Sequence, residues 1–596
     1  MNSSLIQSHP QYGVRRAGVC IPLWSLLSEK SFECGDIYSL RASLPWLKQS
    51  GLSILQILPL NDCGIGQSPY SSLSSFAIDP LYISLHLAGI SVYSRKKNIA
   101  THKINKNKIT KLKLDLLKEK FLKEDKSLYL TLDSFILSNT WLKPYLCFRI
   151  LYNLNDGKHW NQWKEESKFN DKLYDSIKMN YKDEFYFLAW LQFLAYSQLK
   201  QTKNLFEKEG ILLKGDMPIL TSSNSSDVWA NPEFFRLDLQ AGAPPDAFSD
   251  LGQNWGFPVL DWKALDKVDY KPWKERLQYQ ENFFHLYRID HVIGMYRIWA
   301  IPLEAKNARY GYFYPQKSVS LNDFELEGLL PDEFINKGFL HKMEEGRYYF
   351  HWDFHKEPGF YDYPQDIQEK LFKLSFQNLK EDESYWKEAG DKVLSKFSTF
   401  TKMLPCAEDL GSVPGFVRES LQEKEMLGID VIRWTRSLEN GSYIPFDKYR
   451  TNAVATLSTH DTSLAMDWWT NELKNGEKAY AESFFLKEAE SEIIEPKRDN
   501  SKIKNMNDLT EVHRKLLEFS FHTSSLYCIH LLQDLLFLGD IAIKEDFVAH
   551  KINTPGTDES KNWNYRFNFT IEDLISKQEL SSQLKYMISE SKRLGL

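Results

Sequence analysis

Several features are scarce in this sequence, and each absence narrows the class of protein. Its 596 residues include only six cysteines, no two of them in a CxxC pair: Cys20, Cys34, Cys63, Cys147, Cys406 and Cys528. Scattered cysteines in so long a chain indicate buried free thiols in a reducing compartment rather than a disulfide framework. No apolar run approaches the roughly 20 residues of a membrane span, and the start lacks a signal-peptide pattern. We therefore expect a cytoplasmic protein with no membrane partner.

Charge of one sign and glycine-rich loops are also scarce. The formal net charge of -6 is small for this length and gives no reason to expect nucleic acid. The lysine-dense stretch at 94–127 contains interspersed acidic residues and almost no aromatic ones, so it fits a solvated amphipathic helix better than a nucleic-acid patch. No glycine-rich phosphate loop opens the chain, because GIGQS at 64–68 is too short a match.

What the chain does contain is a recurring unit, a short apolar run that ends in polar or acidic residues. Seven clear runs and a weaker eighth have this form: GVCIPLWSL (18–26), LSILQILPLND (52–62), ILLKGDMPI (211–219), HLYRIDHV (285–292), MLPCAEDLG (403–411), GIDVIRW (428–434), AVATLSTHD (453–461) and DFVAHKINTPG (546–556). Such runs are typical of parallel strands covered on both faces, and helix-like patterns separate most of them. Eight strand–helix units predict an α/β fold, a (β/α)8 TIM barrel; the alternative is a doubly wound open sheet.

The uneven spacing of these units indicates insertions within one catalytic domain that spans residues 1–596. Residues 90–205 are predicted to form a helical insertion. A second insertion, at about 305–400, carries YGYFYPQ and HWDFHKEPGFYDYPQ and separates two strands with candidate catalytic residues. That position suits a lid over the mouth of an active site.

Three carboxylates follow predicted strands, which is where a TIM barrel carries its chemistry: Asp290, Glu408 and Asp461. Arg288 lies two positions from Asp290 on the same strand face, so we expect it to keep that carboxylate ionised and fix its rotamer. Apolar neighbours in LPCA should raise the pKa of Glu408 and keep it protonated as a general acid. His460 and Asp461 form a pair suited to gripping ring hydroxyls. The alternative is that these groups are buried ion pairs that brace the barrel.

Two carboxylates on opposite sides of a bond, one a nucleophile and one an acid/base, are the apparatus of a retaining glycosidase. The chain is rich in aromatic residues, with 17 Trp, 30 Tyr and 37 Phe, which build cores but also flat walls for sugar rings. FSDLGQNWGFPVLDW (248–262) is predicted to be a loop, interrupted by Gly and Pro, in which Gln253 and Trp255 contact a sugar. Trp255 could instead belong to the core.

These residues lie within an ordered set of motifs that resembles the amylomaltase, or disproportionating-enzyme, type of 4-α-glucanotransferase (glycoside hydrolase family 77). The set covers most of the chain: GVCIPLWSL, QILPLND, SPYSSLSSFAIDPLYISL, KGDMPI, SSDVWANPEFFRLDLQAGAPPDAFSDLGQNWGFPVLDW, RIDHVIGMYRIWAIP, AEDLG, STHDTSLAMDWW and NTPGT. The resemblance implies transfer of α-1,4-glucosyl or glucan units from maltose or malto-oligosaccharides to glucose or glycogen- and starch-like acceptors. It also implies a retaining mechanism, no cofactor, and a barrel with inserted subdomains but no separate C-terminal β-domain.

Position by position, the resemblance implies that Asp290 is the nucleophile, Glu408 the acid/base and Asp461 the transition-state stabiliser. It implies that Tyr70 of SPY stacks on the sugar ring beside the cleaved bond. The remaining predicted substrate contacts are Asp216, Asp246, Gln253, Trp255, Arg288, His291 and His460.

The sequence also departs from the common bacterial pattern. About 118 positions separate Asp290 from Glu408, and STHDTSLAMDWW has an unusual ending. These features and LGIDVIRWTR are closer to the plant cytosolic, maltose-using branch, whose N-terminal starch-binding modules we expect to be absent here. Two other functions remain open: an α-amylase-like hydrolase, against which the amylomaltase-type loops argue, and a catalytically silent glycan-binding protein, against which the three carboxylates argue.

A metal site is not expected. His351 and His355 have the spacing of a metal pair on a helix face, but no third ligand stands nearby in the sequence. The oligomeric state is left open.

Overall fold

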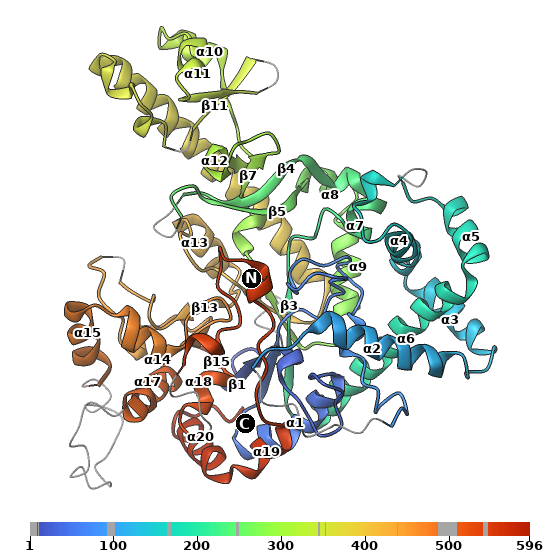
Figure 1. The fold of residues 1–596 in the computed structure, drawn as a ribbon. Coiled ribbons are helices and arrows are strands. Elements are labelled where there is room, and N and C mark those ends of the chain that lie inside the picture. The colour runs from blue at the N-terminus through green and yellow to red at the C-terminus, as the bar shows by residue number, and fades with distance from the viewer. Residues whose placement is uncertain are drawn as a thin grey trace.

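Eight parallel strands form the central sheet, in the order β12-β6-β3-β2-β1-β15-β14-β13 (Figure 1). The computed structural model describes residues 9, 11–91, 102–163, 168–245, 249–343, 346–351, 353–437, 439–486, 509–539 and 546–595. All residues of the eight strands are buried: β1 (Arg16–Ile21), β2 (Ile54–Ile57), β3 (Leu212–Met217), β6 (Leu286–Ile289), β12 (Leu404–Ala407), β13 (Gly428–Val431), β14 (Ala453–Thr456) and β15 (Tyr527–Leu531). A parallel bridge between Cys406 and Leu427 nearly closes the sheet. The predicted (β/α)8 barrel is confirmed.

The eighth strand is not the one predicted. The weak run at 546–556 contains only a short 3-10 helix, Val548–His550, and the strand is YCIHL at 527–531. The apolar residues continue directly into α18 (Leu532–Leu536), so their pattern alone does not separate strand from helix. β15 pairs with both β1 and β14, which places the first and last strands side by side.

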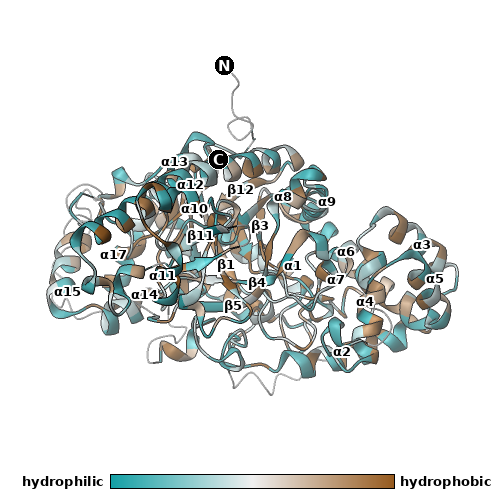
Figure 2. Cartoon of the chain, turned by 90° about the horizontal axis from the view of Figure 1, so that it is seen from above, coloured by the Kyte–Doolittle hydropathy of each residue, from teal (hydrophilic) through white to brown (hydrophobic). Residues whose placement is uncertain are grey.

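Helices surround the barrel, and each carries both hydrophobic and hydrophilic residues, brown and teal in Figure 2. Their buried apolar side chains belong to the core. They include α1 (Ile37–Gln49), α7 (Ser226–Ala230), α8 (Trp262–Lys267), α9 (Lys271–Gln280), α13 (Gly415–Glu423), α14 (Ala465–Asp467), α15 (Asn475–Ala481), α17 (Leu509–His522), α19 (Ile571–Ser576) and α20 (Gln578–Glu590). Within the described ranges no strand follows β15, so they hold no separate C-terminal β-domain.

Five helices lie between β2 and β3: α2 (Lys106–Phe121), α3 (Leu128–Ser138), α4 (Leu142–Leu154), α5 (Asp171–Asn180) and α6 (Lys182–Lys208). Two buried glutamines of α6 attach this group to the loop after β2. Gln192 exchanges two hydrogen bonds of 2.9 Å with the backbone of Ile78, and Gln198 does the same with Ser84 at 2.9 and 3.0 Å. Because these amides replace the partners that a loop backbone lacks, they hold the loop that carries Tyr70.

A second group of elements lies between β3 and β12. One antiparallel sheet, in the order β5-β4-β7-β8, contains β4 (Phe235–Ala243), β5 (Gln253–Leu260), β7 (Ile298–Pro302) and β8 (Tyr312–Tyr314). Residues 319–374, here called the arm, have an apolar core of their own and project from the barrel (Figure 1). The arm contains β9 (Val319–Ser320), α10 (Leu321–Leu326), α11 (Pro331–Asn336), β10 (Leu340–Lys342), β11 (Arg347–Phe350) and the start of α12 (Gln365–Phe400).

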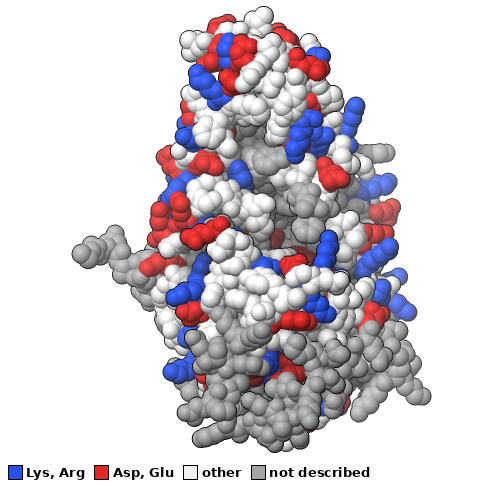
Figure 3. All heavy atoms as spheres, turned by 90° about the vertical axis from the view of Figure 1, so that its left-hand side faces the viewer, with Lys and Arg blue, Asp and Glu red and all other residues white. Residues whose placement is uncertain are grey.

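Acidic and basic side chains are interspersed on the face of the molecule drawn in Figure 3, in keeping with the small net charge. Among the helices of the described residues, none combines the length and apolar character that crossing a bilayer requires.

Candidate active site

Two candidate catalytic carboxylates follow neighbouring strands. β6 and β12 are hydrogen-bonded to each other, and their register pairs Ile289 with Ala407. Asp290 and Glu408 are the next residue on each strand, so the parallel pairing brings both to the same edge of the barrel. The backbone fixes both positions, since the Glu408 N–H donates to the Ile289 carbonyl at 2.9 Å and the Asp290 N–H to the Met217 carbonyl at 3.1 Å.

Arg288 lies at the centre of these charges. Its Nη1 is 2.9 Å from Oδ1 of Asp216 and 2.7 Å from Oδ1 of Asp290. Its Nη2 is 3.7 Å from Oε2 of Glu408. One buried guanidinium therefore contacts three carboxylates that come from three adjacent strands.

Glu408 has the properties of a proton donor. Burial raises its pKa to about 7, although Arg288 lowers it. The backbone N–H groups of His291 and Leu410 donate to its two oxygens at 2.8 and 3.1 Å and also lower the pKa. The upward shift agrees with the prediction from its apolar neighbours, and it leaves this carboxyl partly protonated near neutral pH.

Asp290 differs from its prediction in one respect. Burial raises its pKa, and Arg288, which was expected to dominate, only opposes that rise. Burial is the main reason, and the negative charges of Asp216 and Asp461 nearby raise the pKa further. Arg288 still lies closer to Asp290 than to Glu408, so the proton is held on Glu408 and Asp290 keeps the ionised form.

Tyr70, His460 and Asp461 form a second group at this edge. The Tyr70 hydroxyl donates to Oδ2 of Asp216 at 2.8 Å and lies 3.0 Å from Nε2 of His460. The same Nε2 is 3.1 Å from Oδ2 of Asp461, and the Asn553 amide donates to Oδ1 of Asp461 at 2.6 Å. Burial opposes ionisation of Asp461, but His460 and Asn553 outweigh it and lower the pKa to about 2. Asp461 is therefore ionised at any physiological pH.

The predicted sugar-contacting loop is in part a strand. β5 begins at Gln253 and lies at the edge of its sheet, where register shifts accommodate Pro258. The half-buried Trp255 packs edge-on against His291, with ring centroids 4.9 Å apart. Burial and Arg288 lower the pKa of His291 to about 4, so its ring is neutral. Gln253 accepts a hydrogen bond from the Trp255 indole at 3.3 Å.

Asp246 lies outside the described residues. Of the other predicted site residues, Asp216, Asp290 and Glu408 all contact Arg288. Tyr70, His460 and Asp461 form a chain of contacts that joins this group at Asp216. Trp255 packs against His291, and Gln253 is hydrogen-bonded to Trp255.

Three contacting residues were not singled out from the sequence. Asn553, Glu559 and Trp563 come from the C-terminal part of the chain and reach the Tyr70–Asp461 group. Asn553 begins the NTPGT motif, which was noted from the sequence without a role, whereas Glu559 and Trp563 follow neither a strand nor a motif that would mark them.

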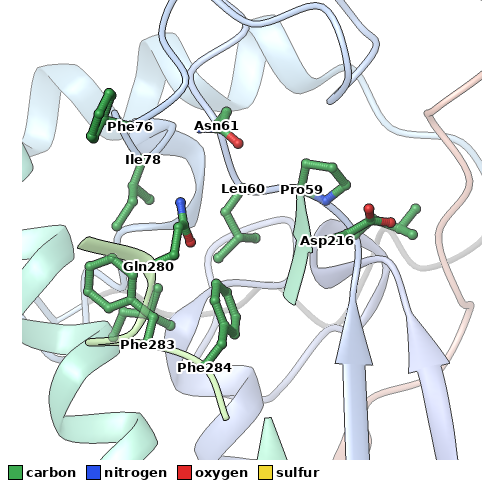
Figure 4. Close-up of a pocket in the computed structure, with 11 residues that line it drawn as sticks. Pro59, Leu60, Asn61, Phe76, Ile78, Asp216, Gln280, Phe283 and Phe284 are labelled. Carbon is green, nitrogen blue, oxygen red and sulfur yellow. The ribbon is translucent and has the colours of Figure 1, made fainter. Parts of the chain in front are cut away.

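A small pocket lies on one side of Asp216, next to Pro59 (Figure 4). Most of the residues that line it are apolar: Leu58, Leu60, Phe76, Ile78, Leu199, Phe283 and Phe284. Asn61 and Gln280 are polar residues of the same lining. Walls of this kind keep water from Asp216 rather than hold a sugar.

Among the described residues, one group of possible metal ligands lies in the arm. His351, Asp353 and Glu357 offer ligand atoms within 4.8 Å of one another, whereas His355, the partner suggested by spacing, is not in this group. The expectation that no third ligand stands nearby was wrong, because it overlooked these two acidic residues. Nη2 of Arg309 lies 3.3 Å from Asp353 and 2.9 Å from Glu357. A cationic side chain thus already pairs with both carboxylates and offsets part of their charge.

Comparisons with known proteins agree with this geometry. The 4-alpha-glucanotransferase family matches residues 21–571. The chain is 30% identical to the 4-alpha-glucanotransferase of Chlamydia trachomatis serovar D, across 95% of this chain and 94% of that protein. It is 27% identical to 4-alpha-glucanotransferase DPE2 of Oryza sativa subsp. japonica, across 97% of this chain and 70% of that protein. A solved amylomaltase from Streptococcus agalactiae, in complex with acarbose, has the same fold, with a TM-score of 0.70, 22% identity and coverage of 97% and 99%.

A (β/α)8 barrel with three carboxylates at the ends of its strands, two of them in contact with one buried arginine, suits an enzyme that acts on glycosidic bonds. The family match makes the class specific. The chain belongs to the 4-alpha-glucanotransferase family, and as a member of that family it is an enzyme.

Proposed function

We propose that the protein moves α-1,4-glucosyl or glucan units from maltose or malto-oligosaccharides to glucose or to glycogen- and starch-like acceptors. The observation that carries this proposal is the contact of Arg288 with both Asp290 and Glu408. It supports an ionised carboxylate and a protonated one beside each other, which a retaining double displacement requires.

In the first step Asp290 attacks the anomeric carbon of the donor. An ester bond forms between this carbon and a carboxylate oxygen, and the glycosidic bond breaks. Glu408 gives its proton to the leaving oxygen, which departs as the hydroxyl of the shortened glucan. Asp461, ionised because its pKa is about 2, stabilises the positive charge that develops on the sugar.

In the second step Glu408, now a carboxylate, accepts the proton of an acceptor hydroxyl. The acceptor oxygen attacks the anomeric carbon, the ester breaks and Asp290 is released, so protons and bonds balance over the cycle. Tyr70, His460 and Asp216 are proposed to bind the sugar around the reacting bond, together with Arg288 beneath it.

Transfer rather than hydrolysis requires that an acceptor sugar be held where water would otherwise attack. We propose that Trp255, with Gln253, Asp246 and His291, forms the acceptor platform. The flat indole packed against His291 supports this role, since an aromatic face binds the apolar side of a pyranose ring.

The domain organisation and location are also proposals. The whole chain acts as one catalytic domain, with 90–205 as a helical insertion and 305–400 as an insertion that covers the active site as a lid. A cytoplasmic enzyme that uses maltose is proposed from the resemblance of LGIDVIRWTR, and of the long separation between Asp290 and Glu408, to the plant cytosolic branch.

The test is a product assay with the purified protein. With maltotriose as the only substrate, a transferase gives maltopentaose and longer glucans along with glucose, whereas a hydrolase gives only glucose and maltose. With maltose, added glycogen should increase the release of glucose. Production of glucose and maltose without longer glucans would establish the hydrolase, and binding without turnover would establish the glycan-binding alternative.

A further inference from the structure

A tryptophan near the C-terminus packs behind two residues of the candidate site. Trp563 is only 6% exposed, and its ring centroid lies 5.5 Å from that of Tyr70 and 5.9 Å from that of His460. The Tyr70 and His460 rings stack on each other at 5.4 Å with an angle of 13° between their planes. Because the three rings contact one another, the orientation of each depends on the other two.

The backbone that presents Trp563 is strained. Its φ of 61° lies in the left-handed region, which a bulky side chain rarely adopts unless its surroundings impose it. The Trp563 N–H donates to the Ile552 carbonyl at 2.9 Å. Asn553, which follows Ile552 in the chain, donates its own N–H to the His460 carbonyl at 3.1 Å. The same short segment therefore fixes Trp563 and the residue against which it packs.

A second contact joins this segment to the loop that carries Tyr70. Oε1 of Glu559 accepts hydrogen bonds from the backbone N–H groups of Gln67 and Ser68, at 3.1 and 2.7 Å. Ser68 in turn accepts a hydrogen bond from the Tyr70 N–H at 3.3 Å. Residues 553–563, here called the clasp, thus hold both Tyr70 and the His460–Asp461 pair.

We propose that Trp563 is a positioning residue for the transfer reaction, acting through Tyr70 and His460, and that the clasp sets the geometry of both. Nε2 of His460 lies 3.0 Å from the Tyr70 hydroxyl and 3.1 Å from Asp461, so a small rotation of the imidazole breaks both contacts. The indole of Trp563 blocks that rotation. This inference rests on the proposed function, because it takes Tyr70 and His460 to bind the glucan.

The test compares Trp563→Ala and Trp563→Phe with a control, Trp46→Ala. Trp46 is fully buried in α1, whose neighbours are α6, α19 and α20, so its loss costs stability without touching the site. The readouts are kcat and KM for total turnover of maltotriose and the melting temperature. We expect Trp563→Ala to lower kcat by about 10- to 100-fold, since a misplacement near 1 Å has this effect. Trp563→Phe keeps a flat ring and should remain within about fivefold of wild type.

The control should lose melting temperature while its kcat per folded molecule stays within about twofold of wild type. Glu559→Ala, an exposed change that removes the acceptor of the Gln67 and Ser68 N–H groups, should lower kcat by about three- to tenfold. If Trp563→Phe is no better than Trp563→Ala, or if Glu559→Ala has wild-type kcat, the inference is overturned. Failure of the proposed function is recognised separately, because it changes which products the wild-type protein forms and not the ratio of variant to wild-type turnover.

Discussion

Two arginine-centred clusters of carboxylates can be compared in this molecule. At the edge of the barrel, Arg288 faces Asp216, Asp290 and Glu408. At the base of the arm, Arg309 faces Asp353 and Glu357, with His351 beside them. Residue types are nearly the same in both, and the arm cluster has the composition of a metal site as well.

The difference between the clusters lies in their charge balance and position. Carboxylates outnumber cations in both clusters, but the excess is larger in the barrel cluster, where one arginine faces three carboxylates. Burial there raises the pKa of Glu408 to about 7, so this group exchanges protons near neutrality. In the arm, burial lowers the pKa of His351 and its ring is neutral, while Arg309 faces only two carboxylates. Only the barrel cluster lies where parallel strands end. Composition alone therefore does not identify a catalytic site. What distinguishes the barrel cluster is a carboxyl group that titrates near neutral pH and lies at the end of a barrel strand.

The largest effect should follow from Asp290→Asn, because an amide cannot form the covalent glycosyl ester. We expect turnover of maltotriose to fall by about 10³-fold or more, with glucan binding retained. The matched change in the arm, Asp353→Asn, should leave kcat near that of wild type. Steady-state kinetics on both variants test the comparison, and a glycosyl adduct trapped on a residue other than Asp290 would contradict the assignment.

The next largest effect concerns Glu408→Gln, which removes the proton donor. Turnover of maltotriose should fall by about 10²- to 10⁴-fold, the usual contribution of a general acid. An α-glucosyl fluoride should recover part of the rate, since fluoride leaves without protonation. Equal loss on both donors would mean that Glu408 supports the fold and not the chemistry.

Raising the pH should have a smaller, graded effect. Because the proton donor must be protonated and its pKa is about 7, kcat/KM should decline by about tenfold per pH unit above that value. The folded protein also binds this proton more tightly than the unfolded chain does. The contribution of Glu408 to the free energy of unfolding is thus present below its unfolded pKa, 4.5, and is lost as the pH rises through about 7. A pH–rate profile that stays level from neutral to alkaline pH would refute the assignment.

Trp255→Ala should change product ratios more than total rate. Loss of the acceptor platform should lower the ratio of transfer to hydrolysis by about three- to tenfold, giving more free glucose from maltotriose. A melting curve serves as the control, because a purely packing role would lower stability and leave the ratio unchanged.

The smallest kinetic effect is expected for Arg309→Met, which unpairs the arm cluster. Leaving Asp353 and Glu357 without their cation should lower the melting temperature by a few degrees. The value of kcat should remain within about twofold of wild type, because no reacting group is touched. If kcat falls as steeply as in Asp290→Asn, the arm cluster takes part in catalysis and the comparison fails.

The sequence predicted seven of the barrel strands because each is a short apolar run with a polar ending. The eighth was missed because YCIHL runs on into the apolar α18, while the weaker run at 546–556 has the same kind of ending without being a strand. Trp255 was assigned to a loop, because Gly256 and Pro258 disfavour regular structure; an edge strand with register shifts tolerates both.

The candidate site was predictable where its residues follow strands, as Asp290 and Glu408 do. The direction of the pKa shift of Asp290 was not, because it depends first on burial and then on the nearby charges of Asp216 and Asp461, and the closed barrel sets all three. The place of Trp563 in the site could not be predicted for a similar reason: its contact with Tyr70, which is distant in sequence, exists only in the tertiary structure.

The pairing of β1 with β15 has a consequence for how the protein is made. A ribosome releases the N-terminal strand first, and β1 must then wait for a partner that begins at Tyr527. Asn553, which donates a hydrogen bond to Asp461, is translated after it, and Trp563, which packs against Tyr70, is translated later still. The nascent chain therefore carries an open sheet edge until the residues of β15 have been translated, and the contacts that hold Asp461 and Tyr70 form only after residue 563 has left the ribosome.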